Sequence, residues 1–435
     1  MGVRPGFKLT EVGVIPEDWR IQTLGELKVL MTNGFVGPVK QHYAENEDGV
    51  LYIQGYNVQE NAFNFHGIKF VTEAFHRAHL KSCLQAGDLL TVQTGDVGLT
   101  TIVPEYLAGS NCHALIITRF DLRRACPSFI SFYLNSDPGR SRLRLIETGT
   151  TMKHLNVGDM LQFWVPLPPT KAEQEAIAEA LSDADALVES LEQLLAKKRH
   201  LKHGAMQELL TGKVRLRAFQ RAERSFRETP FGQVPADWIP TLLESISDSI
   251  TKGSTPTTYG FDWQSDGILF LRSECVSQRG LELSQSMFIS EEAHRSIHRS
   301  KVSGGDLLMT ITGNVGRVVW LRNDFGEANI NQHIARIRIV SGQVAAAFIF
   351  HFLSQPLVRR YYNLITTGQA YPQISLRQVR ETEIPLPSLD EQTAIAAVLT
   401  DMDAEIAALE TKLAKARQLK QGMMQELLTG RIRLV

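Results

Sequence analysis

Short polar turns carry the residue types in this chain that are best suited to contacting another molecule. Thr94-Gly95-Asp96 and Thr312-Gly313-Asn314 each stand between two short apolar runs of strand type. Thr32-Asn33-Gly34 and Thr251-Lys252-Gly253 form a second matching pair. Such turns expose backbone N–H groups that could contact a phosphate, and the same residues are equally suited to simple chain reversal. The full phosphate-loop pattern is absent, so a β-hairpin with a polar tip is the better interpretation.

No pattern of residues indicates catalysis. The sequence lacks the tetrapeptides of amino-group methyltransferases, the phosphate-binding loop of ATPases, the dinucleotide fingerprint and the nucleophile elbow of hydrolases. The four cysteines, which are Cys83, Cys112, Cys126 and Cys275, show no zinc spacing. We therefore expect no catalytic residue, no metal and no cofactor in this chain.

Charge and hydropathy limit the partner and the compartment. The net charge of the 435 residues is −1, so binding to an acidic polymer would depend on local basic patches. Basic residues cluster near the end of the first long helix, as Lys197 to Lys202, and in the linker that follows, as Lys213, Arg215, Arg217, Arg221, Arg224 and Arg227. About half of such patches are expected to be solvated faces balanced by acids. With no signal peptide, no membrane span and unpaired cysteines, a cytoplasmic protein is expected.

The elements that position these turns repeat once, at half the chain length. Glu173 to Leu216 and Glu391 to Leu434 are identical at about 27 of roughly 44 aligned positions, which is far above chance. The opening segments repeat as well, since GVIPEDW ending at Trp19 matches GQVPADW ending at Trp238. Both tryptophans are expected in the core. The chain is therefore predicted to hold two equivalent modules.

Each repeat ends in a long helix. Thr170 to Glu173 and Ser388 to Glu391 have the pattern of a capping box, and Gly212 and Gly430 are placed to end the helices. Apolar residues alternate in steps of four and three, which favours pairing of the two helices over burial of each in a globular core. One extra step of three, through Lys198 to Leu201 and Ala416 to Leu419, predicts a local register shift. The predicted seam residues are Ile177, Leu181, Val188, Leu191, Leu195, Ile395, Leu399, Ile406, Leu409 and Leu413.

Between the opening turn and the helix, each half contains many short strands and a few helices. The chain is therefore predicted to be α+β, with two mixed α/β modules and a pair of long helices. Residues 36–86 and 255–303 match poorly between the halves. Two modules that share a frame but differ in these parts suggest two binding units for two different targets.

Taken together, these residues resemble the specificity subunits of type I restriction–modification systems over essentially the whole chain. The resemblance rests on the duplicated opening, the TGD and TGN hairpins, the NCH and NQH segments and the QELLTG helix ends. It also rests on the entries VPLPPTKAEQ and IPLPSLDEQ into the helices.

The resemblance implies two target-recognition domains, at 1–168 and 228–387, related by a pseudo-twofold. It implies spacer helices at 169–212 and 388–430, which form an antiparallel coiled coil, a linker at 213–227 and a tail at 431–435. The chain would be the non-catalytic reader of a bipartite, asymmetric double-stranded DNA site. Two adenine methyltransferase subunits carrying S-adenosylmethionine would dock on the helices, and restriction–translocase subunits would join them.

Base edges and phosphates are contacted mainly by Arg, Lys, Asn and Gln side chains. Asp96 would repel a phosphate, so it is either structural or accepts from a cytosine amino group. The candidates for DNA contact are Lys40, Gln54, Lys69, Lys81, Lys153, His154, Lys252, Thr255, Arg272, Lys301, Asn314, Arg317, Tyr371 and Gln373.

Two other interpretations remain open from the sequence. The first is a specificity subunit of a related methyltransferase–nuclease system with different partners. The second is a coiled-coil scaffold that binds proteins and never contacts DNA. A shift of DNA mobility in the presence of the methyltransferase subunit would separate the second from the main interpretation.

Overall fold

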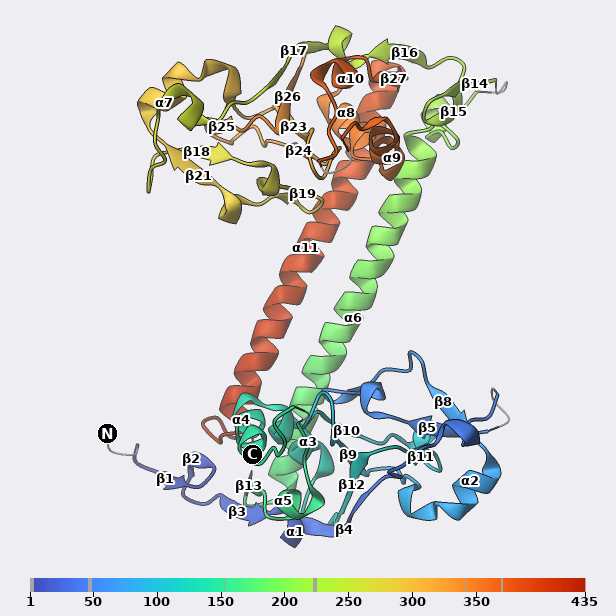
Figure 1. Ribbon diagram of the computed structural model, residues 1–435, viewed down its shortest axis with the longest axis vertical. Coiled ribbons are helices and arrows are strands. Elements are labelled where there is room, and N and C mark those ends of the chain that lie inside the picture. Colours follow the sequence, from blue (N-terminus) through green and yellow to red (C-terminus); the bar gives the residue numbers. More distant parts are fainter. Residues whose placement is uncertain are drawn as a thin grey trace. The chain divides into compact units, whose positions relative to one another are not determined.

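The computed structural model describes residues 4–45, 49–151, 153–221, 225–340, 342–368 and 371–434. Contacts divide the chain into two compact units: Met1–Glu192 with Thr411–Val435 (unit 1), and Gln193–Glu410 (unit 2). The two long helices, α6 (Lys171–Leu209) and α11 (Leu389–Leu427), have 39 residues each and contribute to both units (Figure 1). Arg224 of the basic linker lies outside the described residues.

Unit 1 is built on an antiparallel sheet with the strand order β10-β9-β12-β4, beside a smaller sheet with the order β11-β5-β8. The larger sheet consists of β4 (Lys28–Asn33), β9 (Leu89–Val92), β10 (Thr100–Ile102) and β12 (Leu115–Phe120). The smaller consists of β5 (Val50–Ile53), β8 (Lys69–Val71) and β11 (Asn111–Cys112). Strand pairs β1–β2 (Phe7–Thr10, Gly13–Pro16), β3–β13 (Arg20–Thr23, Trp164–Leu167) and β6–β7 (Val58–Gln59, Ala62–Phe63) complete it. Its shorter helices are α1 (Leu24–Leu27), α2 (Glu73–Ala78), α3 (Pro127–Asn135), α4 (Asp137–Leu145) and α5 (Val157–Leu161).

Unit 2 repeats this plan with sheets of order β17-β26-β23-β24 and β21-β18-β25-β22. The first sheet consists of β17 (Ser247–Lys252), β23 (Leu307–Thr310), β24 (Val318–Trp320) and β26 (Ile334–Ile339). The second consists of β18 (Ile268–Leu271), β21 (Met287–Ile289), β22 (Lys301–Val302) and β25 (Ala328–Ile330). The remaining pairs are β14–β15 (Phe226–Thr229, Gly232–Pro235), β16–β27 (Ile239–Leu242, Glu383–Leu386) and β19–β20 (Val276–Ser277, Gly280–Leu281). Its shorter helices are α7 (Glu291–Ser296), α8 (Ala346–Leu353), α9 (Pro356–Ile365) and α10 (Leu376–Arg380).

The strand pairing corrects one sequence match between the repeats. The sequence aligns Asn111 with Asn331, but β5 pairs with Asn111 in the way that β18 pairs with Asn329. Asn111 and Asn329 are both fully buried and both contact a histidine, His76 and His294 respectively. The shared Asn-x-His pattern therefore does not mark equivalent positions, because the loop before β26 in unit 2 is one residue longer than its equivalent in unit 1.

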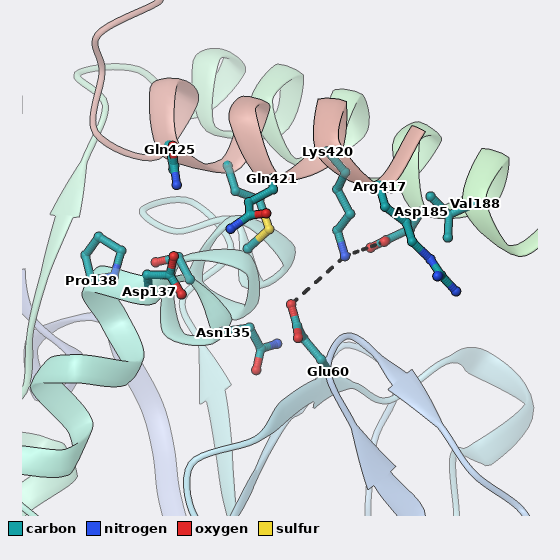
Figure 2. Close-up of a pocket in the computed structure, with 12 residues that line it drawn as sticks. Glu60, Asn135, Asp137, Pro138, Asp185, Val188, Arg417, Lys420, Gln421 and Gln425 are labelled. Carbon is teal, nitrogen blue, oxygen red and sulfur yellow. Dashed lines mark ion pairs between the residues drawn. The ribbon is translucent and has the colours of Figure 1, made fainter. Parts of the chain in front are cut away.

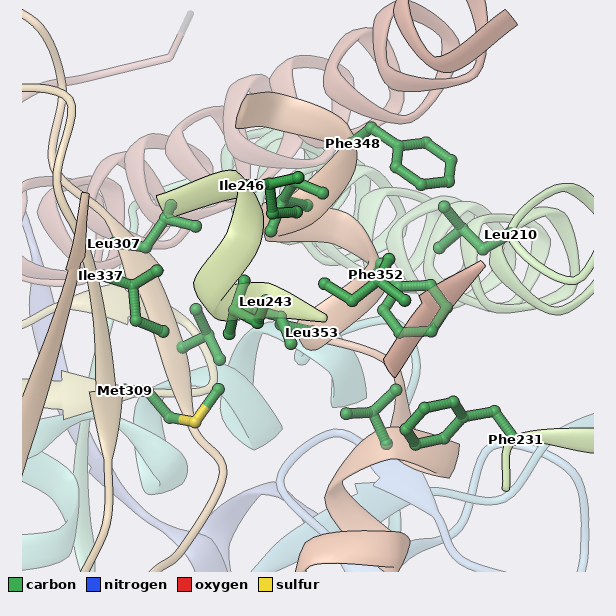
Figure 3. Packing of buried hydrophobic residues seen from close by; sticks show 14 of the residues in the cluster. Leu210, Phe231, Leu243, Ile246, Leu307, Met309, Ile337, Phe348, Phe352 and Leu353 are labelled. Carbon is green, nitrogen blue, oxygen red and sulfur yellow. The ribbon is translucent and has the colours of Figure 1, made fainter. Parts of the chain in front are cut away.

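The predicted tryptophan anchors are confirmed. Trp19 and Trp238 are fully buried and each meets a phenylalanine edge-on, with ring centroids 6.2 Å apart for Phe129 and 6.3 Å apart for Phe348. Figure 3 shows Phe348 and Phe352 of α8 near Leu210, which follows α6. The end of α6 therefore belongs to the core of unit 2, and the end of α11 belongs in the same way to the core of unit 1.

The predicted helix stops and the hydroxyl half of each predicted capping box are confirmed, whereas the carboxylates of Glu173 and Glu391 pair instead with Arg433 and Arg215. The N–H of Glu173 donates to Thr170 Oγ1 at 3.2 Å, and the N–H of Glu391 donates to Ser388 Oγ at 3.3 Å. Gly212 and Gly430 have φ of 66° and 69°, which is the left-handed conformation expected after a helix. A Cβ on either glycine would lie 2.5 Å from the ring of Pro235 or Pro16, so a close approach also requires glycine there.

The predicted path of the helix seam through Leu201 and Leu419 is wrong, although the alternation of steps is interrupted in this region. Leu201 and Leu419 are 47% and 60% exposed, whereas Met206 and Met424 are buried. The seam runs instead through Lys202 and Lys420, whose side chains are only 21% and 19% exposed, with two successive steps of four that end at Met206 and Met424. A lysine can lie on such a seam because its aliphatic stem packs while its ammonium group reaches a partner. Of the predicted seam residues, Val188, Ile406 and Leu409 are half-buried and the others are buried.

Much of the basic cluster is engaged by acids within unit 2. Lys198 pairs with Glu405 at 2.7 Å, Arg199 with Glu410 at 2.5 Å, and Arg221 with Asp237 at 3.2 Å. These cations therefore have acidic partners within unit 2 and do not form an open phosphate-binding patch. For these three cations, the interpretation of the cluster as a solvated basic face balanced by acids is confirmed.

A buried histidine makes the stability of unit 2 depend on pH. Burial lowers the pKa of His351 on α8 to about 4, although the nearby Asp403 carboxylate opposes this and Lys202 reinforces it. Between pH 6.5 and about 4 the unfolded chain takes up a proton that the folded chain does not, so stability falls as the pH falls. Since one pKa unit corresponds to about 1.4 kcal/mol, the loss is at most about 3 kcal/mol.

We expect that His351→Phe, which introduces the residue of the equivalent position in α3, removes this part of the pH dependence. Urea unfolding of the wild type and of His351→Phe at pH 7 and pH 4.5 measures how the free energy of unfolding changes with pH. The matched control is His298→Phe, because His298 is exposed. Identical pH dependence in wild type and His351→Phe would show that this histidine does not titrate as described.

Candidate nucleic-acid interface

Strand direction brings the polar turns of unit 1 to one edge of its larger sheet. Strands β9 and β4 end at this edge and β10 and β12 begin there, because all neighbours are antiparallel. The turn 93–96, the segment 33–35 and the loop 113–114 are therefore neighbours. Gln93 Nε2 lies 3.4 Å from Asn33 Oδ1, which joins two of them. We call this edge, with its loops, the first polar edge.

The loop 148–154 joins the same edge. Thr94 and His154 form a β-bridge, and Thr94 Oγ1 lies 2.9 Å from His154 Nδ1. The neighbouring Lys153 is exposed, as is Asp96 at the tip of the hairpin. The sequence alone had placed these two loops far apart in the chain. The structure therefore groups His154 and Lys153 with Asp96.

Unit 2 has an equivalent second polar edge. Strand β17 ends there at Lys252, β23 ends before the turn 312–314, and β26 begins there after His333. Gln373 forms a β-bridge with Thr312, and the N–H of Gly313 donates to Pro372 O at 2.8 Å. Thr255 Oγ1 donates to Gln332 Oε1 at 2.6 Å. The predicted residues at this edge are Lys252, Thr255, Asn314, Arg317, Tyr371 and Gln373.

Gln54 and Arg272 border the two edges at equivalent places. They follow Ile53 and Leu271, whose carbonyl groups accept from His113 N at 2.8 Å and from Asn331 N at 3.1 Å. Each therefore lies beside the loop that leads into the central strand of the larger sheet. Gln54 Nε2 donates to Tyr56 Oη at 3.1 Å, and Arg272 Nε donates to Gln285 O at 3.1 Å.

The other four predicted residues lie on the smaller sheets or in turns. Lys69 begins β8, and Lys301 begins β22 opposite Asn329. Lys40 and Lys81 are exposed in short turns, at Lys40–His42 and Leu80–Ser82. The structure does not bring Lys40 or Lys81 into either polar edge.

Sequence reasoning missed His113 and Gln332, which occupy the edges but belong to no turn signature. His113 Nδ1 lies 3.1 Å from Tyr52 Oη, and burial lowers the pKa of His113, so it is neutral near pH 7. Gln332 Nε2 lies 3.2 Å from His333 Nε2. The available signal was that both lie directly before a buried strand that neighbours the hairpin strand.

The two edges share a backbone but differ in charge and in hydrogen-bonding groups. Asn33, Gln54 and Asp96 of the first edge correspond to Lys252, Arg272 and Asn314 of the second. Amides can both donate and accept, an aspartate only accepts, and lysine and arginine only donate. The two edges are therefore complementary to different patterns of donors and acceptors.

The repeated Gly-Asp turns support the sheets to which the two polar edges belong. Asp88 and Asp306 are buried, and each carboxylate accepts two hydrogen bonds from one arginine, Arg119 or Arg338, at 2.7 and 2.8 Å. Bidentate pairs of this kind hold neighbouring strands in a fixed geometry. No cluster of metal-ligating side chains occurs among the described residues. Within the same residues, no helix has the length and apolarity to cross a membrane.

Comparison with known proteins assigns a family to this architecture. The family model of the type I restriction modification DNA specificity domain matches residues 16–197 and again residues 235–418. The putative type I restriction enzyme MjaX specificity subunit of Methanocaldococcus jannaschii is 24% identical over 98% of this chain and 97% of its own length. The EcoBI specificity subunit of Escherichia coli is 26% identical, over 69% of this chain and 65% of its own length.

Among solved structures, the type I restriction–modification S subunit from M. genitalium has a similar fold. The TM-score is 0.61 at 16% sequence identity, with 97% of this chain and 98% of that chain covered. A chain from a study of complex assembly and conformational transition of a type I R-M system gives a TM-score of 0.52 at 17% identity, covering 96% and 99%. At these identities the likeness concerns the fold alone.

Proposed function

Since this chain belongs to the family of type I restriction–modification DNA specificity subunits, we propose that its two polar edges read the two parts of one bipartite DNA site. The chain is a DNA sequence-recognition subunit of such a system. The observation that carries the proposal is the pairing of one repeated backbone with two different sets of side chains. The repeated backbone suits the DNA double helix that both halves would contact, and the differing side chains suit different base sequences.

The chemistry of the edges suggests what each one reads. Arg272, Arg317 and Lys252 of the second edge are donors, which suits the O6 and N7 acceptors of guanine and the phosphates. Asp96 of the first edge is an acceptor, which suits the amino group of cytosine. Asn33 and Gln54 suit adenine, which offers one donor and one acceptor in the major groove.

We infer the remaining parts of the complex from the likeness to this family. Because the family is generally non-catalytic, partner subunits would supply N6-adenine methylation and DNA cleavage. Two methyltransferase subunits would dock on α6 and α11, whose near-identical sequences offer two equivalent surfaces. S-adenosylmethionine would bind to those subunits, and restriction–translocase subunits would join the assembly.

We expect that the double variant Lys252→Ala, Lys301→Ala weakens DNA binding for all sequences. Each lysine that contacts a phosphate releases about one counterion, so the slope of log K against log salt should fall by about two. Titration of the complex with the methyltransferase subunit at several salt concentrations measures the slope. The matched control, Arg322→Ala with Arg377→Ala, removes two exposed cations that already pair with acids. An unchanged slope in the lysine variant would remove both residues from the contact surface.

A further inference from the structure

Arg336 of β26 is a buried cation without an acidic partner, and it is only 8% exposed. Nη1 donates to Lys301 O, Nη2 lies 3.3 Å from Ser249 Oγ, and Nε is buried without an acceptor. Among the residues that the structure describes, no carboxylate pairs with this guanidinium. Arginine stays charged in proteins, and a buried charge without a counter-charge is costly. An anion from outside the chain would therefore stabilise it.

Two other partly buried cations of the chain have carboxylate partners. Figure 2 shows Lys420 directed at Asp185, with Nζ 2.5 Å from Oδ1. Arg338, which follows Arg336 by two residues on β26, donates two hydrogen bonds to the carboxylate of Asp306. Burial and the charge of Arg338 lower the pKa of Arg336, although Asp306 opposes this. The carboxylate of Asp306 is therefore already engaged by another arginine, and Arg336 is left without a pair.

The polar groups around Arg336 form a layer on one face of the larger sheet. Ser249 and Thr251 of β17 face the same side as Arg336, whereas Ile250 between them belongs to the hydrophobic core. The turn at Arg299 lies against this layer, because Thr251 Oγ1 donates to Arg299 O at 3.2 Å. Arg299 is exposed, and Ser249 and Thr251 are half-buried, so the layer is open to solvent. We call Arg336, these two β17 residues and the turn 299–301 the Arg336 layer.

The Arg336 layer borders the second polar edge. Strand β17 ends at this edge with Lys252, and the residue before it, Thr251, pairs with Arg336. A strand rises about 3.4 Å per residue, so Ser249 lies about 10 Å from Lys252 along the strand. Lys252 is exposed and Lys301 is half-buried, and neither has an acidic partner among the described residues. Positive charge therefore continues from the edge into the layer.

In unit 1, apolar residues and a cysteine replace this layer. The strand pairing places Leu30, Cys83 and Ile117 at the positions that correspond to Ser249, Lys301 and Arg336. Ile117 is buried within an apolar cluster. Since the same sheet forms in unit 1 around an isoleucine, the shared fold does not require the buried arginine. A role of unit 2 that unit 1 does not share would account for its cost.

We propose that Arg336, Ser249 and Lys301 form an oxyanion site that binds one phosphate of the DNA backbone beside the half-site of unit 2. A guanidinium forms strong, charge-assisted hydrogen bonds with phosphate oxygens, and the serine hydroxyl can turn to donate as well. This inference rests on the proposed function and deepens it. A phosphate contact fixes the position of a protein on the duplex without reading a base, and here only unit 2 makes it.

The test measures the coupling between Arg336 and single DNA phosphates. The full chain, in complex with its methyltransferase subunits, binds DNA of the selected sequence in which one phosphate at a time is an uncharged methylphosphonate. We expect one replacement, beside only one of the two half-sites, to weaken wild-type binding about tenfold. In Arg336→Met the same replacement should weaken binding less than about twofold, because the two changes remove one shared interaction.

Methionine keeps an unbranched apolar stem and removes the buried charge, so Arg336→Met should fold. A second variant combines Ser249→Leu, Lys301→Cys and Arg336→Ile, which are the residues that unit 1 packs at these positions, and it should lose the coupling too. The matched control is Arg322→Met, because Arg322 is exposed and already pairs with Asp324. Its response to each methylphosphonate should equal that of wild type.

The same response to every methylphosphonate in wild type and in both layer variants would overturn the proposal. Thermal unfolding in inorganic phosphate at constant ionic strength separates a free anion from DNA as the ligand. Stabilisation of wild type but not of Arg336→Met, without coupling to any DNA phosphate, would assign the site to a free anion and also overturn it. A wild-type complex that selects no DNA sequence would contradict the proposed function, whereas a selective complex without coupling contradicts this inference alone.

Discussion

Replacing Arg215 with alanine is expected to lower the free energy of unfolding of unit 2 by about 3–5 kcal/mol. Arg215 Nε donates to Glu391 Oε1 at 2.8 Å, and Nη1 donates to Asp237 Oδ2 at 2.9 Å. Glu391 is fully buried, so loss of the arginine leaves a buried carboxylate without its counter-charge. Denaturant unfolding, followed by tryptophan fluorescence, measures the effect.

Two further variants separate this mechanism from a general loss of side-chain contacts. Arg377→Ala removes an arginine that is 82% exposed and pairs with Glu381 four residues later, so the change in the free energy of unfolding should be below about 0.5 kcal/mol. Arg215→Met together with Glu391→Leu should recover most of the lost stability, because no buried charge remains. Equal effects of Arg215→Ala and Arg377→Ala would show that the buried carboxylate is not the cause.

Lengthening both long helices is expected to lengthen the DNA spacer. The ion pairs Glu192–Arg417 and Arg199–Glu410 place Leu194 of α6 and Lys412 of α11 near the middle of the seam. Four residues inserted after both Leu194 and Lys412 leave the ion pairs on either side of the insertion intact. Four residues add about 6 Å of helix. At 3.4 Å per base pair, the half-sites should move apart by one to two base pairs.

The same insertion in α6 alone serves as the control. It separates Asp185 and Lys202 along α6 without a matching change in α11. The ion pairs Asp185–Lys420 in unit 1 and Lys202–Asp403 in unit 2 then cannot form together. We expect this variant to lose affinity for every spacer. If the matched double insertion instead retained the wild-type spacer at wild-type affinity, the helices would not determine the separation of the half-sites.

The sequence was sufficient for features that depend on local chemistry. Capping hydroxyls, the glycines that end the helices and the tryptophan anchors are all fixed by short-range preferences, and they occur in the structure as predicted. Internal repetition added the division into two modules. The family model, which matches each repeat separately, is consistent with that division.

Features that depend on long-range pairing could not be derived. Lys202 and Lys420 lie on the seam only because an aspartate of the other helix reaches them, and the apolar pattern pointed to the exposed Leu201 and Leu419 instead. The polar edges depend on strand order, which brings His154 to Thr94. The DNA contacts named above remain predictions.

One measurement tests the central claim most directly. The wild-type chain, in complex with its methyltransferase subunits, is used to select DNA from a fully randomised library at a fixed salt concentration, and the bound DNA is sequenced. We predict two different half-sites, separated by a spacer of constant length in which no base is preferred. Bound DNA with no enriched sequence, or with one uninterrupted motif, would contradict the claim that the two polar edges read two separate parts of one DNA site.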